Sequence, residues 1–192
     1  MDKVFSGKLI VFSAPSGAGK TTIVHHLINQ NLGLEFSISA CSRSKRKNEI
    51  NGKDYYFLST KEFKQKINNN EFVEWEEVYP DHFYGTLKAE LERIWGNGHH
   101  VIFDVDVVGG LNIKNSYPKK TLAIFVQPPS VEELRERLYK RSTDSQYNIE
   151  KRISKAEKEL SYSQKFDTII VNDKLEDAII EAEIKVRGFL NS

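Results

Sequence analysis

The stretch Ala14-Pro-Ser-Gly-Ala-Gly-Lys-Thr21 decides the fold of this chain, because of what lies on either side of it. The apolar run 9–12 before it predicts a buried strand. Residues 21–31 after it predict a helix with its apolar side chains on one face. A glycine-rich turn that ends in Lys-Thr between a strand and a helix is typical of a phosphate-binding loop.

Each part of this loop has a chemical reason to bind a nucleoside triphosphate. Successive backbone N–H groups line a concavity for phosphate oxygens, Lys20 brings a positive charge to the β- and γ-phosphates, and the Thr21 hydroxyl can ligate Mg²⁺. Ala14 stands where the motif usually has glycine. The alternative, a glycine-rich turn without a ligand, is disfavoured by the flanking elements. The predicted triphosphate-binding residues are Ala14, Pro15, Ser16, Gly17, Ala18, Gly19, Lys20, Thr21 and Thr22.

Working outward, apolar runs alternate with amphipathic segments, which predicts an α/β fold with a parallel sheet core flanked by helices. Residues 43–90 differ, because they combine an Asn51-Gly52 turn, aromatic and β-branched segments and a capping box at Ser59 and Glu62. We expect an insertion of mixed strands and one helix that holds a substrate. The other predicted strands are 101–103, 122–126, 168–171 and, more weakly, 36–39; the other predicted helices are 130–141, 149–164 and 175–190.

Bulk properties narrow the class of protein. A chain of 192 residues suits one domain, and 28 basic against 27 acidic residues give a net charge of +1, which implies no general affinity for nucleic acid or anionic membranes. There is no signal-peptide layout and no run long enough to span a membrane. Cys41 is the only cysteine, which favours a reducing, cytoplasmic setting. No obligate protein partner is evident.

Two carboxylates follow the strand predicted at 101–103. The run His99-His-Val-Ile-Phe-Asp-Val-Asp106 ends in Asp104 and Asp106, and a carboxylate at such a strand end commonly supports a metal ion or its waters. We expect Mg²⁺ at Thr21, with Asp104 acting through a water molecule. The alternative is an acidic turn after a core strand.

The type of phosphate-loop protein follows by exclusion. The chain has no guanine-reading Asn-Lys-x-Asp, since Asn172-Asp-Lys174 has the wrong order, and it is too short for a large motor or helicase. A small kinase remains. Arg137 and Arg141 share a helix face and Arg152 follows eleven residues on, so that these guanidinium groups can stabilise the charge of the moving phosphoryl group. The alternative is a set of solvated surface arginines.

The insertion begins with the basic run Arg43-Ser-Lys-Arg46. An acceptor that carries a phosphate needs a cationic clamp, because two polyanions must approach within bonding distance, and Arg43 and Arg46 can supply bidentate contacts. A phosphate oxygen is already an anionic nucleophile. No general base is therefore required.

Several stretches read, in order, SAPSGAGKT, SISACSRSKR, NGKDYYF, NNEFVEW, FYGT, FDVDVVG, PPSVEELRERLYKR, EKRISKAEKEL and IIVND. They run from about residue 9 to residue 173 and closely resemble the guanylate kinase family. The resemblance implies a P-loop nucleoside monophosphate kinase over residues 1–192. Its core would cover about 1–36, 91–128 and 166–192, its GMP-binding insertion about 37–90, and its helical lid about 129–165.

The resemblance also implies an activity, Mg²⁺-dependent transfer of the ATP γ-phosphoryl group to GMP or dGMP in purine nucleotide metabolism, and a set of roles. The catalytic residues would be Lys20, Arg43, Arg137, Arg141 and Arg152. The loop residues together with Asn172, near the adenine, would bind ATP. Arg43, Arg46, Tyr55 and Tyr84 would hold the GMP phosphate, Ser39, Glu74 and Thr86 would read the guanine, and Asp104 would also contact GMP.

The chemistry of Glu74 supports a guanine acceptor. Guanine presents two neighbouring donors, N1–H and the exocyclic amine, which one carboxylate accepts together, whereas adenine has an unprotonated N1 there and leaves the carboxylate unpaired. The alternative is an exposed strand residue beside Trp75. The chain departs from the family pattern where Val108 replaces a glutamine and where Tyr79-Pro-Asp-His82 lengthens a loop.

Two other functions stay open. A guanylate-kinase-like binding module would keep the fold and recruit protein partners without turning over ATP. A kinase for another nucleoside monophosphate would use AMP, UMP or dTMP comparably. The complete set of loop and arginine residues argues against the first, and Glu74 argues against the second.

Overall fold

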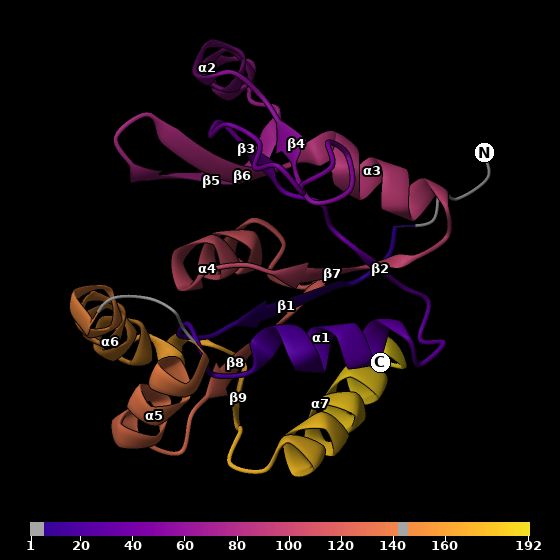
Figure 1. Ribbon diagram of the computed structural model, residues 1–192. Coiled ribbons are helices and arrows are strands. Elements are labelled where there is room, and N and C mark those ends of the chain that lie inside the picture. Colours follow the sequence, from indigo (N-terminus) through magenta and orange to yellow (C-terminus); the bar gives the residue numbers. More distant parts are fainter. Residues whose placement is uncertain (1–5, 142–145) are drawn as a thin grey trace.

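The computed structural model describes residues 6–141 and 146–192, apart from the side chains of Arg141, Tyr147 and Asn148. A five-stranded parallel sheet with the order β2-β7-β1-β8-β9 forms its centre (Figure 1). In β1, Leu9 is in register with Val101 of β7 on one side and with Thr121 of β8 on the other. The strands are β1 (Leu9–Ser13), β2 (Leu34–Phe36), β7 (His100–Asp104), β8 (Thr121–Gln127) and β9 (Thr168–Val171).

The parallel sheet and its main strands are as predicted, but the strand expected at 36–39 is wrong beyond Phe36. The N–H of Ser37 still donates to the carbonyl oxygen of Ile102 in β7 at 3.0 Å, but the N–H of Ile38 donates to Oε1 of Glu90 at 2.9 Å instead of to a neighbouring strand. This segment is the outgoing connection to a second sheet.

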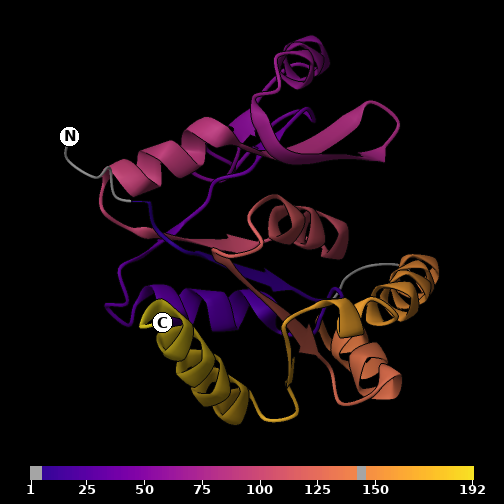
Figure 2. The same cartoon turned by 180° about the vertical axis from the view of Figure 1, so that it is seen from behind.

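Helices cover both faces of the parallel sheet (Figures 1 and 2). Ile10 and Phe12 of β1 face α1 (Lys20–Ile28) and α7 (Leu175–Leu190), because successive side chains of a strand point to opposite faces. Leu9 and Val11 face α3 (Lys88–Gly96) and α4 (Val107–Ser116). The sheet is therefore buried on both sides, which explains its uninterrupted apolar strands.

Helices α3 and α4 were not among the predicted elements. Gly109 and Gly110 lie in the first turns of α4. Because glycine is a poor helix former, the local sequence does not predict this helix. Asp106 begins it by accepting a hydrogen bond from the N–H of Gly109 at 2.7 Å. A residue larger than glycine at 110 would meet Ser13 and Val11 of β1, so close packing on the sheet accounts for that residue.

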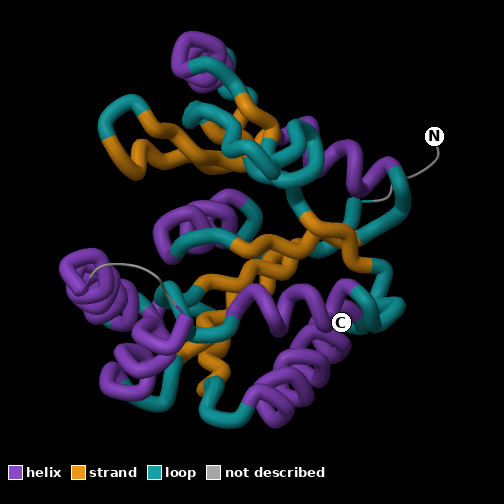
Figure 3. The backbone as a smooth tube through the Cα atoms, viewed as in Figure 1, coloured by secondary structure: helices purple, strands orange, loops and turns teal. Residues whose placement is uncertain are grey.

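The insertion forms a four-stranded sheet of its own, with the order β4-β3-β6-β5, which Figure 3 shows apart from the central sheet. Phe63 stacks on Phe72 with ring centroids 4.4 Å apart, and both pack with Phe83 and Ala40 in a separate apolar cluster. The predicted capping box at Ser59 and Glu62 is confirmed. The elements are β3 (Ala40–Cys41), β4 (Tyr56–Phe57), α2 (Thr60–Asn68), β5 (Phe72–Tyr79) and β6 (His82–Leu87).

A pair of helices, α5 (Val131–Arg141) and α6 (Gln146–Leu160), extends from the sheet end of β8 and packs through its own cluster around Leu134 and Ile153 (Figure 2). The predicted start of α5 is confirmed, since Ser130 Oγ accepts from the N–H of Glu133 at 3.0 Å. A short 3-10 helix (Ser163–Lys165) leads back to β9. Within the described ranges, no helix has the length and apolar character needed to cross a membrane.

Candidate nucleotide and acceptor site

The loop between β1 and α1 has the backbone geometry of a phosphate cradle. Gly17 and Gly19 have φ angles of 95° and 92°, a left-handed conformation that glycine adopts without strain. Helix α1 begins at Lys20, so its first N–H groups and its positive dipole end face the same space. The predicted loop is thus built from the predicted residues.

Lys20 and Thr21 both reach the carboxyl end of β7. Nζ of Lys20 donates to the carbonyl oxygen of Val105 at 2.9 Å and forms an ion pair with Asp104. Thr21 Oγ1 donates to Oδ2 of Asp104 at 2.7 Å. The lysine, the hydroxyl and the carboxylate expected to serve the phosphates and the metal are therefore in direct contact.

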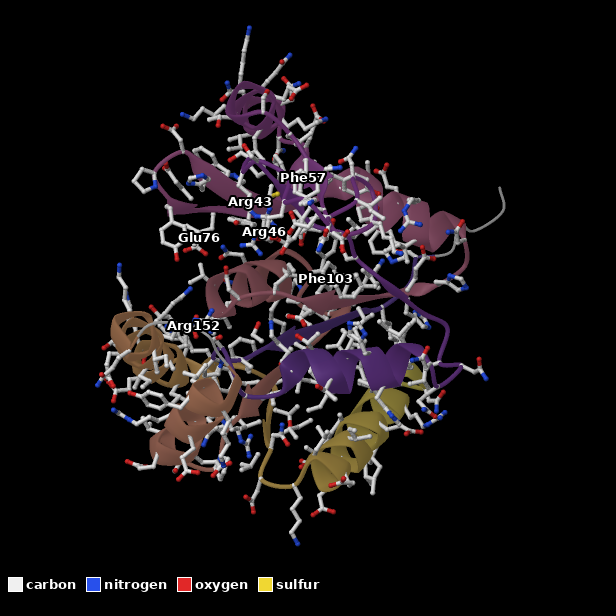
Figure 4. All side chains as sticks on the ribbon, viewed as in Figure 1. Arg43, Arg46, Phe57, Glu76, Phe103 and Arg152 are labelled. Carbon is white, nitrogen blue, oxygen red and sulfur yellow. The ribbon has the colours of Figure 1, made fainter. Side chains whose placement is uncertain are left out.

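A cavity of about 420 Å³ opens over this loop and is bounded on its far side by α6. Arg152, predicted to serve the transferred phosphoryl group, borders it, and Figure 4 shows Arg152 on the side of α6 that faces the core. The lining residues are Ala14, Pro15, Ser16, Gly17, Gly19, Lys20, Thr21, Thr22, Asp104, Val105, Asp106, Arg152, Lys155 and Glu159.

The donor set at Thr21 and Asp104 fits Mg²⁺. One hydroxyl and one carboxylate lie 2.7 Å apart at the edge of the phosphate cavity. In the part of the chain that the structure describes, no three His, Cys, Asp or Glu side chains gather as a metal cluster. That suits Mg²⁺, which usually keeps several waters and binds through one or two carboxylates together with substrate phosphates.

Arg137 lies on the other side of the loop. It borders a separate cavity of about 270 Å³ with Asn172, and its Nη1 donates to the carbonyl oxygen of Asn172 at 3.0 Å. The buried side-chain amide of Asn172 donates to the carbonyl oxygen of Ala18 at 2.7 Å and so stabilises the phosphate-binding loop. The side chain of Arg141 lies outside the described residues. Of the other two predicted arginines, Arg152 borders the phosphate cavity and Arg137 a separate one, so the structure does not bring them together.

The acceptor side is a cavity of about 230 Å³ between the second sheet and α4. It brings together predicted residues from the insertion and from the end of β7, namely Ser39, Tyr55, Glu74, Tyr84 and Asp104. It shares Asp104, Val105 and Asp106 with the phosphate cavity, so the two cavities adjoin at the end of β7. Two substrates bound in them would meet at the Asp104 carboxylate.

Glu74 is buried at the base of the acceptor cavity, with 9% of its surface exposed. Burial, together with the negative charges of Asp106 and Glu76, raises the pKa of Glu74 to about 7. Thr86 is completely buried, and its hydroxyl donates to Oε1 of Glu74 at 2.8 Å. Thr86 therefore orients the carboxylate rather than lining the cavity.

Two carboxylates of this cavity were not predicted to contact the acceptor. Glu76 follows Glu74 by two residues, so strand alternation puts both on one face of β5, and this spacing was the signal that could have found it. Asp106 lies opposite on the core. Burial and the neighbouring Asp106 raise the pKa of Glu76 to about 7, whereas Lys155 of α6 lowers it. Insertion, core and helical pair thus meet around these two residues.

Arg43 lies on the side of the second sheet that faces α4, near Arg46 (Figure 4). Its guanidinium carbon is 5.0 Å from the ring centre of Tyr55 and 5.5 Å from that of Phe57. Tyr55 and Tyr84 lie edge to face, with centroids 6.1 Å apart. The cation and the two tyrosines predicted to hold the acceptor phosphate therefore form one cluster, while Arg46 is exposed beside it.

Comparisons with known proteins agree on one family. The sequence profile described as guanylate kinase matches residues 6–186. The guanylate kinase of Bacteroides fragilis is 55% identical over 188 residues, which cover 98% of this chain and 92% of that protein. That of Porphyromonas gingivalis is 53% identical over 184 residues, covering 95% and 98%. The crystal structure of guanylate kinase from Anaplasma phagocytophilum superposes with a TM-score of 0.75 at 29% identity, over 96% of this chain and 86% of that one.

Proposed function

The chain belongs to the guanylate kinase family, and from this premise we propose which of its residues carry the transfer of a phosphoryl group from ATP to GMP. It is a nucleoside monophosphate kinase that converts ATP and GMP into ADP and GDP. The observation on which the residue assignment depends is Glu74, a buried carboxylate that lines one of two adjoining cavities.

On the donor side, the loop residues 14–22 cradle the ATP phosphates and Lys20 holds the β- and γ-phosphates. Lys20 must exchange part of its present contact with Asp104 for the phosphates, which frees that carboxylate for a water of the metal shell. Thr21 and Asp104 are the residues that would hold Mg²⁺, which when bound neutralises charge on the β- and γ-oxygens. Asn172 keeps the loop in shape and lies beside the cavity toward which the adenine would extend.

On the acceptor side, Arg43 and Arg46 bind the GMP phosphate together with the hydroxyls of Tyr55 and Tyr84. Glu74 accepts N1–H and the exocyclic amine of guanine, with Thr86 orienting it and Ser39 at the cavity wall. Adenine would leave the buried carboxylate without these donors, which makes rejection of AMP strong. The site therefore selects a guanine nucleotide, as GMP or dGMP.

Transfer itself requires positioning and charge neutralisation rather than a base. An oxygen of the GMP phosphate attacks the γ-phosphorus of ATP in line with the leaving ADP, and Lys20 stabilises the charge that spreads over the transferred group. Arg152 borders the phosphate cavity and supplies a second cation. Arg137, which now borders the neighbouring cavity, and Arg141 would act from α5 after the helical pair closes over ATP. The proposed setting is the cytoplasm, where ATP is abundant and the single Cys41 stays reduced.

A coupled assay with ATP, Mg²⁺ and a panel of monophosphates tests this assignment. Wild-type enzyme should use GMP and dGMP and reject AMP, UMP and dTMP. Glu74→Gln should lower kcat/KM for GMP roughly 100-fold or more, because a buried pairing is lost, and leave the KM for ATP within about twofold. A GMP specificity constant unchanged by Glu74→Gln would contradict the guanine assignment.

A further inference from the structure

One carboxylate, that of Glu49 in the loop between β3 and β4, holds Arg43. Nη1 of Arg43 donates to Oε2 of Glu49 at 2.6 Å, and Nη2 donates to Oε1 at 2.5 Å, so the ion pair is bidentate. Oε2 also accepts the backbone N–H of Arg46 at 2.8 Å. Both side chains are shielded, with exposed fractions of 13% for Arg43 and 16% for Glu49. The carboxylate therefore joins the two arginines at the acceptor phosphate.

The geometry of this pair leaves part of the guanidinium for another acceptor. Of the five N–H donors of arginine, two go to Glu49, and the second N–H of Nη1 goes to the carbonyl oxygen of Ser44 at 3.1 Å. The N–H of Nε and the second N–H of Nη2 lie along the other edge of the planar group. Neither Glu49 nor Ser44 uses that edge, which has the spacing to bind two oxygens of one phosphate. The hydroxyls of Tyr84 and Tyr55 also interact with Arg43, so a phosphate bound there would meet the guanidinium and both hydroxyls together.

Two aromatic rings limit how the plane of the Arg43 guanidinium can rotate, in addition to the ion pair with Glu49 that fixes its end. The ring of Tyr55 lies over it at 5.0 Å and that of Phe57 at 5.5 Å. Hydrogen bonds from Arg43 lower the pKa of Glu49 to about 2, so the carboxylate is ionised at any pH near neutrality. A long side chain that is already held in one orientation loses little conformational entropy when its ligand arrives.

We propose that Glu49 is a positioning residue for GMP, which acts by holding the guanidinium of Arg43 end-on so that its other edge, beside the Tyr55 and Tyr84 hydroxyls, faces the acceptor phosphate. This inference rests on the proposed assignment of Arg43 to that phosphate. Without Glu49, Arg43 remains charged and can still bind phosphate. Its side chain must then be ordered when GMP binds, and the lost conformational entropy weakens GMP binding.

The test compares Glu49→Gln with wild type by steady-state kinetics. The KM for GMP should rise roughly five- to tenfold, the factor expected when one long side chain must be ordered on binding. The KM for ATP should stay within about twofold and kcat within about threefold. Glu71→Gln is the matched control, because Glu71 is also an ion-paired carboxylate of the insertion but contacts Lys66 and Asn69 instead of an arginine of the site.

A double-mutant cycle separates this inference from the assignment on which it depends. Arg43→Lys alone should raise the KM for GMP, and if it does not, the assignment of Arg43 fails. If Glu49 acts through Arg43, adding Glu49→Gln to Arg43→Lys should change the KM for GMP by less than about twofold, because lysine cannot be held as a fork.

Other outcomes would overturn the proposal while the Arg43 assignment survives. A lower KM for GMP in Glu49→Gln would show that Glu49 competes with the phosphate. An unchanged KM, or equal rises in the KM for GMP and ATP, would show a structural role alone. Glu49→Asp keeps the charge on a shorter side chain, so its KM for GMP should lie between those of wild type and Glu49→Gln. A KM for GMP in Glu49→Asp as high as that of Glu49→Gln would count against positioning by the carboxylate.

Discussion

At the residue scale, Glu74, the residue proposed to bind the guanine base, is also sensitive to pH. Its pKa of about 7 in the folded protein lies above the unfolded value of 4.5, because burial disfavours the charged form. A carboxyl group shifted upward contributes stability that is fully present below pH 4.5 and is lost as the pH rises through about 7. The ionised carboxylate that the proposed guanine contact requires therefore costs the folded protein stability.

Loss of this carboxylate should therefore change how stability depends on pH. Glu74→Gln should be more stable relative to wild type at pH 8 than at pH 5, by about 1–3 kcal/mol, since a glutamine has no proton to lose. Urea unfolding at the two pH values measures the difference. If the difference in the free energy of unfolding between the two proteins were the same at both pH values, burial of Glu74 would not control its protonation.

The same group should control GMP binding. The base donors of guanine require the ionised carboxylate, so the KM for GMP should rise as the pH falls below about 7. The phosphate of GMP also titrates, with a pKa near about 6. Glu74→Gln serves as the control, because it keeps the titration of the GMP phosphate and of Glu76 but loses that of Glu74. Identical pH profiles for the two enzymes would refute the prediction.

Gly19 is the loop position with the least room for a side chain. Its φ is +92°, and a Cβ there would lie 2.2 Å from Nδ2 of Asn172, which braces the loop. Gly19→Ala should raise the KM for ATP at least about tenfold, through a strained backbone and a displaced Asn172. Gly96→Ala, where nothing lies within 4 Å of the added carbon, is the control and should leave the KM for ATP unchanged.

At the element scale, α3 connects the two sheets through one buried residue. Glu90 is 2% exposed and accepts hydrogen bonds from the N–H of Ile38, the hydroxyl of Tyr56 and the guanidinium of Arg93. Burial alone would raise its pKa, but these donors outweigh burial and lower it. Ile38 lies on the outgoing connection and Tyr56 on β4, so Glu90 joins both to the helix that returns to the core.

Removal of the Glu90 charge should weaken the connection between α3 and the two sheets. Glu90→Gln should lower the free energy of unfolding by about 1–3 kcal/mol, because a buried charge-assisted network loses its acceptor. Because the pKa of Glu90 is lowered, the wild-type advantage should be full above pH 4.5 and shrink below it. Denaturant unfolding measures this, and Glu92→Gln on the exposed side of α3 should change stability by less than about 0.5 kcal/mol.

At the scale of the whole molecule, the groups that serve the two substrates lie on separately packed parts. Arg43 belongs to the insertion with its own aromatic cluster, Arg152 to the α5–α6 pair with its own aliphatic cluster, and Lys20 to the core. Each cluster can move as a unit without being unpacked. A kinase must exclude water from the γ-phosphate, which such movement of the insertion and of the helical pair would achieve.

Closure over both nucleotides should therefore make the molecule more compact. X-ray scattering should give a smaller radius of gyration with a bisubstrate analogue than without ligand, and ATP alone should give a smaller change because the insertion has no acceptor to bind. Equal radii in all states would contradict closure.

The sequence alone determined those features that depend on neighbours along the chain. The loop at 14–21 is recognisable because its turn, its lysine and its helix start are contiguous, and the central strands are recognisable because burial on both faces removes polar residues from short runs. Glu74 and the arginines were predicted as site residues, and their proposed roles follow from the family that the chain matches.

Only the tertiary structure decided which of these groups meet. It placed Arg137 and Arg152 on opposite sides of the loop, brought Glu76 and Asp106 into the acceptor cavity and paired Arg43 with Glu49. Helix α4 depends on glycines packed against the sheet rather than on helix propensity. The physical reason is the same in each case. These contacts form between residues that are distant in the chain, so no local sequence pattern predicts them.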